Sequence, residues 1–538
     1  MTSTDPAVEA AATGSDHAAP DPDSTSVEPT RARPGWVIPV AVGAVIALLA
    51  GGFLVALAVG NSRSDSGPSG KVGSGPNVLV IMTDDQTYES MRVMSRTNEL
   101  IGRQGTVFSS YYVSFPNCCP SRATYLTGQY AHNNGVRDNL PPLGGWAALK
   151  PDETVPVWMQ RAGYRTAHIG KYLNLWGSTG QDDKVGAGDI TPPPGYDHWF
   201  GLIDPTTYDY FNYSVSVNGE RFQWGNRPED YQTDVLGQEV VNTVTRFGAE
   251  GKPWFVSFTP LAPHTGGGVE SSPTAIDLWQ FPVAAPRHQG MFKGEPITRG
   301  PAWNEADVSK KPAEIRKQPP IDANFDATQI DTTRREYEAL QAVDEAVEKI
   351  INTLRDTGQL DNTLILFTSD NGSFHGEHRI PYGKTKLYEE ASHVPFMMRG
   401  PGVPVGVVAQ QFAGNVDLAP TILAAASGTA GVALDGRDLR PLASDSTLGT
   451  NRSMLLENWI TYTSDRTWAL RGGQWYYSTW SNGDRELYDM SRDPYQVNNV
   501  VNEPSYAAVV ASLDARLNVL KTCAGATCED SDASRAPK

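Results

Sequence analysis

Val78-Leu79-Val80-Ile81-Met82 is an unbroken apolar run, and Thr83-Asp84-Asp85 follows it at once. Such a run is typical of a strand that is buried on both faces of a parallel sheet. Three later runs have the same character, at 165–169, 254–258 and 363–368. Helical patterns lie between these runs, as at Tyr337 to Arg355, where apolar residues recur on one face. The alternation predicts an α/β fold in which helices sandwich a mixed, mostly parallel sheet.

Each predicted strand is followed by polar residues of complementary chemistry. They are Asp84 and Asp85 after the first run, Lys171 after the second, His264 after the third, and Asp370 and Asn371 after the fourth. Ligands of such folds bind outside the carboxyl ends of the strands, so these side chains are candidate site residues. The alternative for the carboxylates and the amide is a helix cap or a simple turn.

A second stretch, Cys118-Cys119-Pro120-Ser121-Arg122, leads into what is predicted to be a helix. A buried pair of neighbouring cysteines is one interpretation of it. The stretch also resembles the signature of the formylglycine-dependent sulfatases, and the resemblance covers most of residues 76–530. It implies an alkaline-phosphatase-like fold. It also implies that Cys118 is oxidised to formylglycine, with a formylglycine-generating enzyme as a partner.

The same resemblance implies a metal site and a set of catalytic residues. The implied ligands of a hard divalent ion, with Ca²⁺ expected and Mg²⁺ as the alternative, are Asp84, Asp85, Cys118, Asp370 and Asn371. Arg122 would orient the modified residue. Lys171 and Lys384 would contact the sulfate oxygens, and His264 would protonate the leaving oxygen. One hydroxyl of the hydrated aldehyde would attack sulfur, and loss of the proton from the other would expel sulfate.

Some segments narrow the resemblance further. They are the cysteine signature, Gly170-Lys171-Tyr172-Leu173-Asn174, Leu387-Tyr388-Glu389, and Cys523 with Cys528. They resemble the N-acetylglucosamine-6-sulfatases and the extracellular heparan sulfatases, which implies a sulfated sugar as the substrate. Asn174, His375 and His378 are then candidates for the substrate pocket. Leu173 stands where many sulfatases have histidine, so that the role of the histidine is either lost or taken by Asn174.

The remaining cysteines, Cys523 and Cys528, lie in a short segment of small residues. They are predicted to form a disulfide, provided that the domain lies outside the cytosol. The alternative is two exposed thiols on a tail. The four cysteines have no spacing that is typical of a zinc site.

The N-terminal region differs from the rest in composition. Residues 1–35 have no aromatic residue and are predicted to be a disordered cytosolic tail. Residues 36–60 carry no charge and are long enough for a transmembrane helix. Arg31 and Arg33 precede this run, so the positive-inside rule predicts a single-pass protein of the cell membrane with an extracytoplasmic catalytic domain. A cleavable signal peptide is the alternative.

The rest of the chain divides by pattern. Residues 61–75 form a Ser/Gly linker, and 76–431 are predicted to be the catalytic domain. Residues 432–530 shift to short strands and turns, including a hairpin around Gly472-Gly473. They are predicted to form a smaller α+β subdomain with an antiparallel sheet. A short tail follows at 531–538.

Charge limits the classes of partner. The chain of 538 residues has a net charge of −17 and no long basic run, which argues against nucleic acid as a partner. The predicted partners are a sulfated small molecule or glycan and, through residues 36–60, a membrane. Two other functions stay open. One is a phosphodiester or phosphonate monoester hydrolase of the same superfamily, and the other is a non-catalytic, membrane-anchored sugar-binding protein with an unmodified Cys118.

Overall fold

A ten-stranded sheet forms the centre of the computed structural model, which describes residues 75–178, 188–266, 281–459 and 466–529. All of these residues belong to one compact unit, Asp65–Lys538. The strand order is β11-β2-β10-β9-β1-β8-β4-β5-β6-β7. The strands are β1 (Asn77–Thr83), β2 (Thr106–Phe108), β4 (Arg165–Gly170), β5 (His198–Leu202), β6 (Ser214–Val217), β7 (Glu220–Gln223), β8 (Trp254–Thr259), β9 (Thr363–Ser369), β10 (Phe396–Arg399) and β11 (Val407–Ala409).

Strand β1 lies in the middle of this sheet, as its apolar run predicts. All of its residues are buried, and it pairs in parallel with both β8 and β9. Strand β4 continues the parallel set beside β8, and β5 continues it beside β4. Antiparallel pairs enter only toward the edges, where β10 joins β9 and β6 joins β5. The prediction of a mixed, mostly parallel sheet is therefore confirmed.

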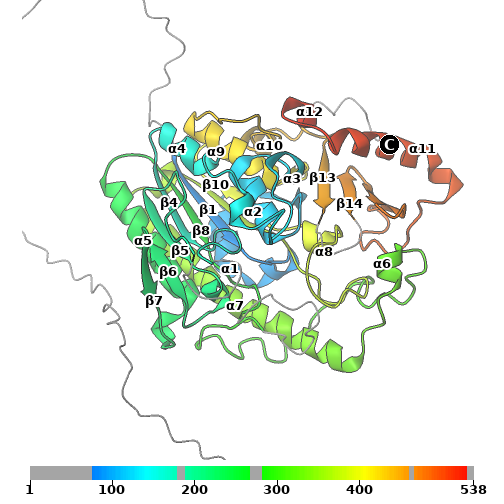
Figure 1. Cartoon of the computed structure of the whole chain (residues 1–538), viewed down its shortest axis with the longest axis horizontal. Coiled ribbons are helices and arrows are strands. Elements are labelled where there is room, and N and C mark those ends of the chain that lie inside the picture. The colour runs from blue at the N-terminus through cyan, green and yellow to red at the C-terminus, as the bar shows by residue number, and fades with distance from the viewer. Residues whose placement is uncertain (1–74, 179–187, 267–280, 460–465, 530–538) are drawn as a thin grey trace, which may run out of the picture. The chain divides into compact units, whose positions relative to one another are not determined.

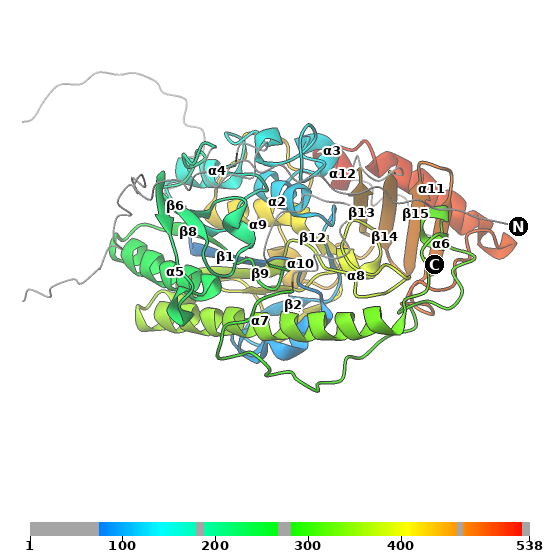
Figure 2. The same cartoon turned by 60° about the horizontal axis from the view of Figure 1, so that its bottom comes forward.

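Helices cover both faces of the sheet (Figures 1 and 2). On one face α5 (Gln232–Ala249) and α7 (Ala323–Asp356) pack against β1 through a cluster that includes Leu79 and Ile81. The other face is covered by α2 (Cys118–Thr127), α4 (Val155–Arg161) and α9 (Leu418–Ala426), which meet Val78 and Val80. Because successive residues of a strand point to opposite faces, β1 contributes side chains to both hydrophobic cores.

Helix α7 is longer than its apolar pattern predicts. The buried face from Tyr337 to Leu354 is present, but the helix begins at Ala323. The side chain of Asp322 caps this end by accepting a hydrogen bond from Phe325 N at 2.8 Å. The first turns of the helix are mostly polar, so that they lack the regular spacing of apolar residues from which a helix is predicted.

A four-stranded antiparallel sheet follows the large one in sequence. Its strands are β13 (Ser453–Asn458), β14 (Thr467–Gly472), β15 (Trp475–Trp480) and β16 (Arg485–Asp489), in sequence order. The predicted hairpin around Gly472-Gly473 joins β14 to β15, and α11 (Ala507–Leu520) packs against these two strands. The domain boundary at 431/432 stays a prediction. The other short elements are β3 (Tyr111–Tyr112), β12 (Ala413–Gly414), α1 (Ser95–Thr97), α3 (Ala131–Asn134), α6 (Ala313–Arg316), α8 (Glu389–Ser392), α10 (Arg440–Ser444) and α12 (Ala526–Glu529).

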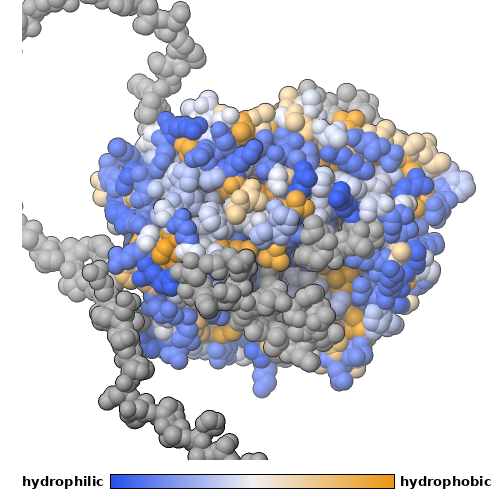
Figure 3. Space-filling model, viewed as in Figure 1, coloured by the Kyte–Doolittle hydropathy of each residue, from blue (hydrophilic) through white to orange (hydrophobic). Residues whose placement is uncertain are grey.

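The prediction of a single-pass membrane protein is wrong, because the helices that the structure describes do not support it. Across the described ranges no helix is both long enough and apolar enough to cross a bilayer. The reason is physical: α7 is long but carries half-exposed ion pairs such as Arg335–Asp331, and apolar runs such as β1 are short buried strands. Figure 3 shows a mostly hydrophilic face. Residues 36–60, where the membrane helix was expected, lie outside the described residues, as do 1–35, 61–74 and 531–538.

Candidate active site

The ends of β1 and β9 bring four oxygen-bearing side chains together. The last residues of the two strands face each other in register, so that Asp84 and Asp370 emerge side by side. Asp370 N donates to Thr83 O at 3.1 Å, and Asp85 N donates to Asp370 Oδ1 at 3.2 Å. Asn371 Nδ2 donates to Asp85 Oδ1 at 2.5 Å. The parallel register therefore places three carboxylates and an amide at one edge of the sheet.

Cys118 faces this group from the first turn of α2, and its side chain is fully buried. Its Sγ lies 3.7 Å from Asp84 Oδ1, 3.5 Å from Lys171 Nζ and 3.0 Å from Lys384 Nζ. The side chain at position 118 thus lies between carboxylates and amines that come from four segments far apart in sequence. The first turn of the helix adds few free donors, because Cys119 N already donates to Asn139 Oδ1 at 2.9 Å and Pro120 has no N–H.

Arg122 lies one helical turn after Cys118 and is almost completely buried. Its guanidinium donates to Asp370 Oδ2 at 2.8 Å, to Asp84 Oδ2 at 2.9 Å and to Lys171 O at 2.9 Å. A planar fork of donors is suited to holding several acceptors at fixed angles. Arg122 therefore locks helix α2 to the strand ends of β1, β4 and β9.

Two lysines neutralise the carboxylates beside Cys118. Lys171 Nζ lies 2.6 Å from Asp84 Oδ2, and Lys384 Nζ lies 2.5 Å from Asp85 Oδ1. Burial alone lowers the pKa of each lysine, but the carboxylates outweigh it and raise both pKa values above their usual range. Burial likewise raises the pKa of Asp84, yet Lys171 and Arg122 hold it well below its usual range. These groups therefore stay charged at neutral pH.

His264 follows β8 and reaches the same group. Its Nδ1 lies 2.7 Å from the carbonyl of Thr265, which can only accept, so that Nδ1 carries a proton. Its Nε2 lies 3.5 Å from Asp85 Oδ2 and faces the centre. Tyr210 fixes the backbone here, because its hydroxyl donates to His264 O at 2.6 Å. The imidazole is thus oriented to exchange a proton at Nε2.

The donor atoms fit a divalent cation. One ligand atom each from Asp84, Asp85, Cys118 and His264 lies within 4.8 Å of the others. Asn371 Oδ1 is buried and has no hydrogen-bond partner, which is costly unless a cation or water completes it. The carboxylates of Asp84 and Asp85 and the amide oxygen of Asn371 are ligands of the kind that Ca²⁺ and Mg²⁺ take, whereas the thiol of Cys118 and the imidazole of His264 are not. His264 is one of the four clustered residues, although it was not predicted as a ligand. Asp370, which was predicted as a ligand, is not among the four, and its carboxylate accepts hydrogen bonds from Arg122 and from Asp85 N.

The thiol at position 118 is a poor nucleophile. Burial raises the pKa of Cys118 to about 12, although Lys171 and Lys384 oppose the shift. Since the thiolate is the reactive form, an unmodified Cys118 is largely inert at neutral pH. The charged side chains around position 118 therefore do not convert the thiol of Cys118 to the reactive thiolate.

The three residues predicted for the substrate pocket lie in different surroundings. The amide of Asn174 contacts Cys119 Sγ at 3.2 Å and donates to Tyr208 OH at 2.6 Å. His375 pairs with Glu336 at 2.8 Å, and this carboxylate outweighs burial and raises the pKa of His375 to about 9. His378 is fully buried 3.0 Å from Glu305 Oε2 and 3.1 Å from Lys311 Nζ. Thus Asn174 adjoins the cysteine pair, whereas His378 belongs to another cluster.

Tyr208 is a neighbour of the site that the sequence did not predict. Lys171 Nζ lies 4.7 Å from the centre of its ring, and the ring lies 5.2 Å from that of His264. It comes from a loop between β5 and β6 that has no motif, so no local signal could have identified it. Its position beside Lys171 and His264 is produced by the tertiary fold.

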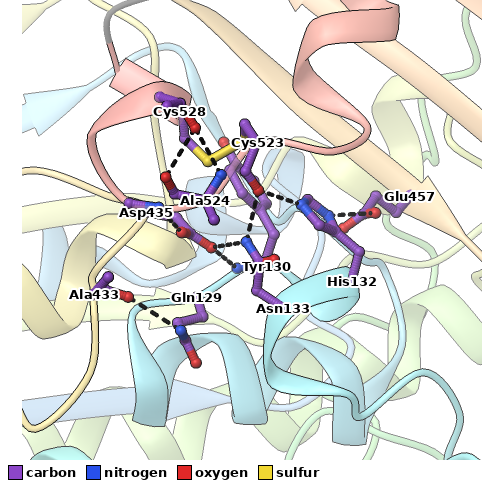
Figure 4. Close-up of a disulfide and its surroundings, with 12 residues drawn as sticks. Gln129, Tyr130, His132, Asn133, Ala433, Asp435, Glu457, Cys523, Ala524 and Cys528 are labelled. Atoms are coloured by element: carbon purple, nitrogen blue, oxygen red, sulfur yellow. Dashed lines mark hydrogen bonds and ion pairs between the residues drawn. A yellow bond between two sulfur atoms is a disulfide. The ribbon is translucent and has the colours of Figure 1, made fainter.

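Cys523 and Cys528 are joined by a disulfide, with an S–S distance of 2.10 Å (Figure 4). The carbonyl of Cys523 accepts a hydrogen bond from Asn133 at 2.8 Å and lies 2.9 Å from His132 Nε2. Asp435 Oδ1 accepts from Gly525 N at 2.7 Å, inside the disulfide loop. This loop is thereby tied to α3, the helix that follows α2.

Comparison with known proteins identifies the family. The model of the Sulfatase family matches residues 76–429, and that of the N-sulphoglucosamine sulphohydrolase C-terminal region matches 376–523. The chain belongs to the sulfatase family. An arylsulfatase of Volvox carteri is 33% identical to this sulfatase over 500 residues, which are 84% of this chain and 75% of the relative. An N-acetylglucosamine-6-sulfatase of Capra hircus is 30% identical over 504 residues, 84% of each chain.

A solved structure supports the same fold for this sulfatase. It is a complex with the substrate D-glucosamine-2-N,6-O-disulfate, and it superposes with a TM-score of 0.66 at 24% identity. The match covers 86% of this chain and all of that chain. The predictions of an alkaline-phosphatase-like fold and of a sulfuric ester hydrolase are thus confirmed by the family and the fold.

Proposed function

We propose that this sulfatase removes sulfate from a sulfated amino sugar, with a hydrated formylglycine derived from Cys118 as its nucleophile. The observation that carries the proposal is the position of Cys118 Sγ, 3.0 Å from Lys384 Nζ, 3.5 Å from Lys171 Nζ and 3.7 Å from Asp84 Oδ1. A sulfate ester needs this combination of a nucleophile and cations that neutralise the sulfuryl oxygens. A formylglycine-generating enzyme of the host would supply the oxidation.

Each residue of the centre has a proposed role. Lys171 and Lys384 bind the sulfate oxygens and stabilise the negative charge that develops on them. Arg122 orients residue 118, and His264 gives a proton to the leaving oxygen from Nε2. A divalent cation, most simply Ca²⁺, would add charge neutralisation when bound by Asp84, Asp85, Cys118, Asp370 and Asn371.

The sugar specificity rests on the relatives. Both the N-acetylglucosamine-6-sulfatase and the solved complex with a glucosamine disulfate bear the name of a sulfated amino sugar. His375 is paired with Glu336 at 2.8 Å, so that its charge is balanced by that carboxylate, and it would contribute to the pocket as a hydrogen-bonding group. Asn174 and His378, which are held in buried contacts, would shape the loops around the pocket.

The test begins with protein produced together with a formylglycine-generating enzyme. Mass spectrometry of the peptide with Cys118 should show a loss of roughly 18 Da from cysteine to aldehyde. The modified protein should then release sulfate from glucosamine 6-sulfate and N-sulfated glucosamine, which are assayed beside an aryl sulfate. An intact thiol after production in the native host would contradict the nucleophile and favour a non-catalytic sugar-binding protein.

The related phosphoryl activity is measured in the same experiment. An aryl phosphodiester and an aryl phosphonate are offered at the same concentration as the aryl sulfate. We expect kcat/KM to be highest for sulfate esters, because a phosphodiester carries the same single charge but also a second ester group that the site would have to accommodate, and the relatives named above are sulfatases. Faster turnover of the phosphodiester would replace the proposed function with that of a phosphodiester hydrolase.

A further inference from the structure

The last residue of β13, Asn458, contacts the loop that carries Lys384. Asn458 is fully buried, and its Nδ2 donates to the carbonyl of Thr385 at 2.5 Å. On the other side of the same residue, Thr385 N donates to Pro116 O at 2.9 Å, just ahead of Cys118. The residue after Lys384 is therefore bound at its N–H by the cysteine segment and at its carbonyl by the C-terminal sheet.

Thr385 adopts a backbone conformation that needs such support. Its φ is +76°, in the left-handed region, where a β-branched residue is a genuine outlier. Residues held there persist only where their surroundings fix them, and they cluster at functional sites. Gly383, on the other side of Lys384, is also bound, because its carbonyl accepts from Phe374 N at 2.8 Å.

The end of β13 also binds the segment that leads to Cys118. Glu457 N donates to Ser114 O at 2.7 Å, and Glu457 Oε1 lies 2.9 Å from His132 Nδ1 (Figure 4). Glu457 and Asn458 are neighbours, so that one strand end contacts both the cysteine segment and the lysine loop. A shift of this strand end would change the distance between residue 118 and Lys384.

We infer that Asn458 is a positioning residue for Lys384, acting through the carbonyl of Thr385. This inference rests on the proposed function, in which Lys384 stabilises the charge on sulfate. Asn458 acts on the lysine through the hydrogen bond from its Nδ2 to the carbonyl of Thr385, the residue that follows Lys384. Without its hydrogen bond the loop relaxes from the left-handed conformation, and the amine leaves its place beside residue 118.

The test compares Asn458→Ala with Asn499→Ala. Asn499 lies in the same part of the chain, is also buried, and donates to the carbonyls of Lys310 and Arg485. We expect Asn458→Ala to lower kcat about tenfold with KM changed less than about twofold, since misplacement of a catalytic group by 1 Å can cost up to about 10²-fold. Asn499→Ala should keep the wild-type kcat, although its unfolding temperature falls.

A double-mutant cycle separates positioning from general damage. If Asn458 acts through the lysine, Asn458→Ala added to Lys384→Ala should lower kcat by less than about twofold beyond the single lysine variant. Effects that multiply, or a wild-type kcat in Asn458→Ala, would overturn the inference. If Asn458→Ala does not fold, Asn458→Leu, which is closer in volume and removes the donor without adding a charge, takes its place in the cycle.

A labelling experiment decides the inference without any turnover. Lys384 is nearly buried between Asp85 and Cys118, so that acetylation of its amine should be slow in the wild type. Asn458→Ala should raise its labelling rate at least about threefold and leave that of Lys171 unchanged, as read by mass spectrometry. Unchanged labelling overturns the inference. A wild-type protein that carries formylglycine yet hydrolyses no sulfate ester would instead remove the proposed function, and the labelling result would still stand.

Discussion

Two buried clusters of charged residues include side chains from the segment after β9. Burial has different effects on the pKa values of the two clusters. The catalytic cluster consists of Cys118 with Asp84, Asp85, Asp370, Arg122, Lys171 and Lys384. In it every carboxylate lies within 3 Å of a cation. Opposite charges hold the pKa of Asp84 below its usual range and those of Lys171 and Lys384 above it, although the groups are buried. Burial and the neighbouring Asp84 raise the pKa of Asp370. The centre thus holds charge ready for a reaction.

The second cluster, the glutamate cluster, consists of Glu305, Glu390, Lys311 and His378. Burial raises the pKa of Glu305 to about 7 and that of Glu390 to about 8, and it lowers the pKa of Lys311 and of His378. Glu305 still lies 3.0 Å from His378 and 3.5 Å from Lys311, but burial outweighs these contacts and the groups approach neutrality. Charged forms are thus favoured around Cys118, where the proposed reaction needs them. Neutral forms are favoured in the glutamate cluster, which has no part in the proposed reaction.

The largest expected effect is that of Cys118→Ala. This variant removes the nucleophile with little change in volume, so that kcat should fall by at least about 10³-fold while the unfolding temperature stays within about 2 °C. The assay is sulfate release from an aryl sulfate. Cys119→Ala is the matched control, because its thiol faces Asn174 and not the carboxylates, and it should keep most of the activity. Near wild-type turnover by Cys118→Ala would show that another group attacks sulfur.

Exchanging one lysine in each cluster tests the comparison directly. Lys384→Ala should lower kcat by about 10²-fold, since it removes a cation that stabilises charge in the transition state. Lys311→Met should leave kcat within about twofold and change only the unfolding temperature, because Lys311 bonds to Tyr488 OH and to His378. Equal losses of kcat in the two variants would mean that the clusters do not differ in role.

Local pattern predicted those parts of the centre that follow strands. The apolar run of β1 placed Asp84 at a strand end, and the run of β9 did the same for Asp370. Lys384 lies on a loop away from any strand, so that only the family resemblance singled it out. Tyr208 contacts Lys171, and Asn458 contacts the loop that carries Lys384. Both contacts join distant segments and leave no trace in local sequence. The residue roles themselves stay proposals.

The prediction of a membrane helix depended on composition alone. An apolar stretch predicts a membrane helix from its own composition, because no partner segment enters the rule. The helices that the structure describes instead bury one face against a sheet, as α7 does through Leu340 and Val347.

The third prediction concerns pH and the glutamate cluster. A carboxyl whose pKa is raised on folding binds more protons in the native state, so that stability falls as pH rises from the ordinary value of 4.5 through the raised one. His378 has the opposite effect, because its lowered pKa makes stability rise with pH up to its ordinary value of 6.5. The unfolding temperature should therefore fall by about 2–5 °C between pH 6.5 and about 8.5. Differential scanning calorimetry of the wild type, Glu305→Gln and Glu390→Gln measures this.

Either glutamine variant should flatten the curve, because the amide mimics the protonated carboxyl and cannot titrate. The lysines of the catalytic cluster remain charged over this range and should not contribute. A rise in unfolding temperature toward pH 8.5 that persists in both glutamine variants would mean that the native state keeps Glu305 and Glu390 ionised, and the contrast between the clusters would disappear.

The smallest effect is expected for Thr385→Gly. Glycine adopts a φ of +76° without strain, but it also gains freedom in the unfolded chain, and each effect is worth about 1 kcal/mol. The two nearly cancel, so that the unfolding temperature should change by less than about 2 °C. The hydrogen bonds of Thr385 N and O do not need its side chain. Turnover should therefore fall less than about threefold, far less than in Lys384→Ala. A loss as large as that of Lys384→Ala would mean that the side chain of Thr385, and not its bound backbone, keeps the amine in the catalytic cluster.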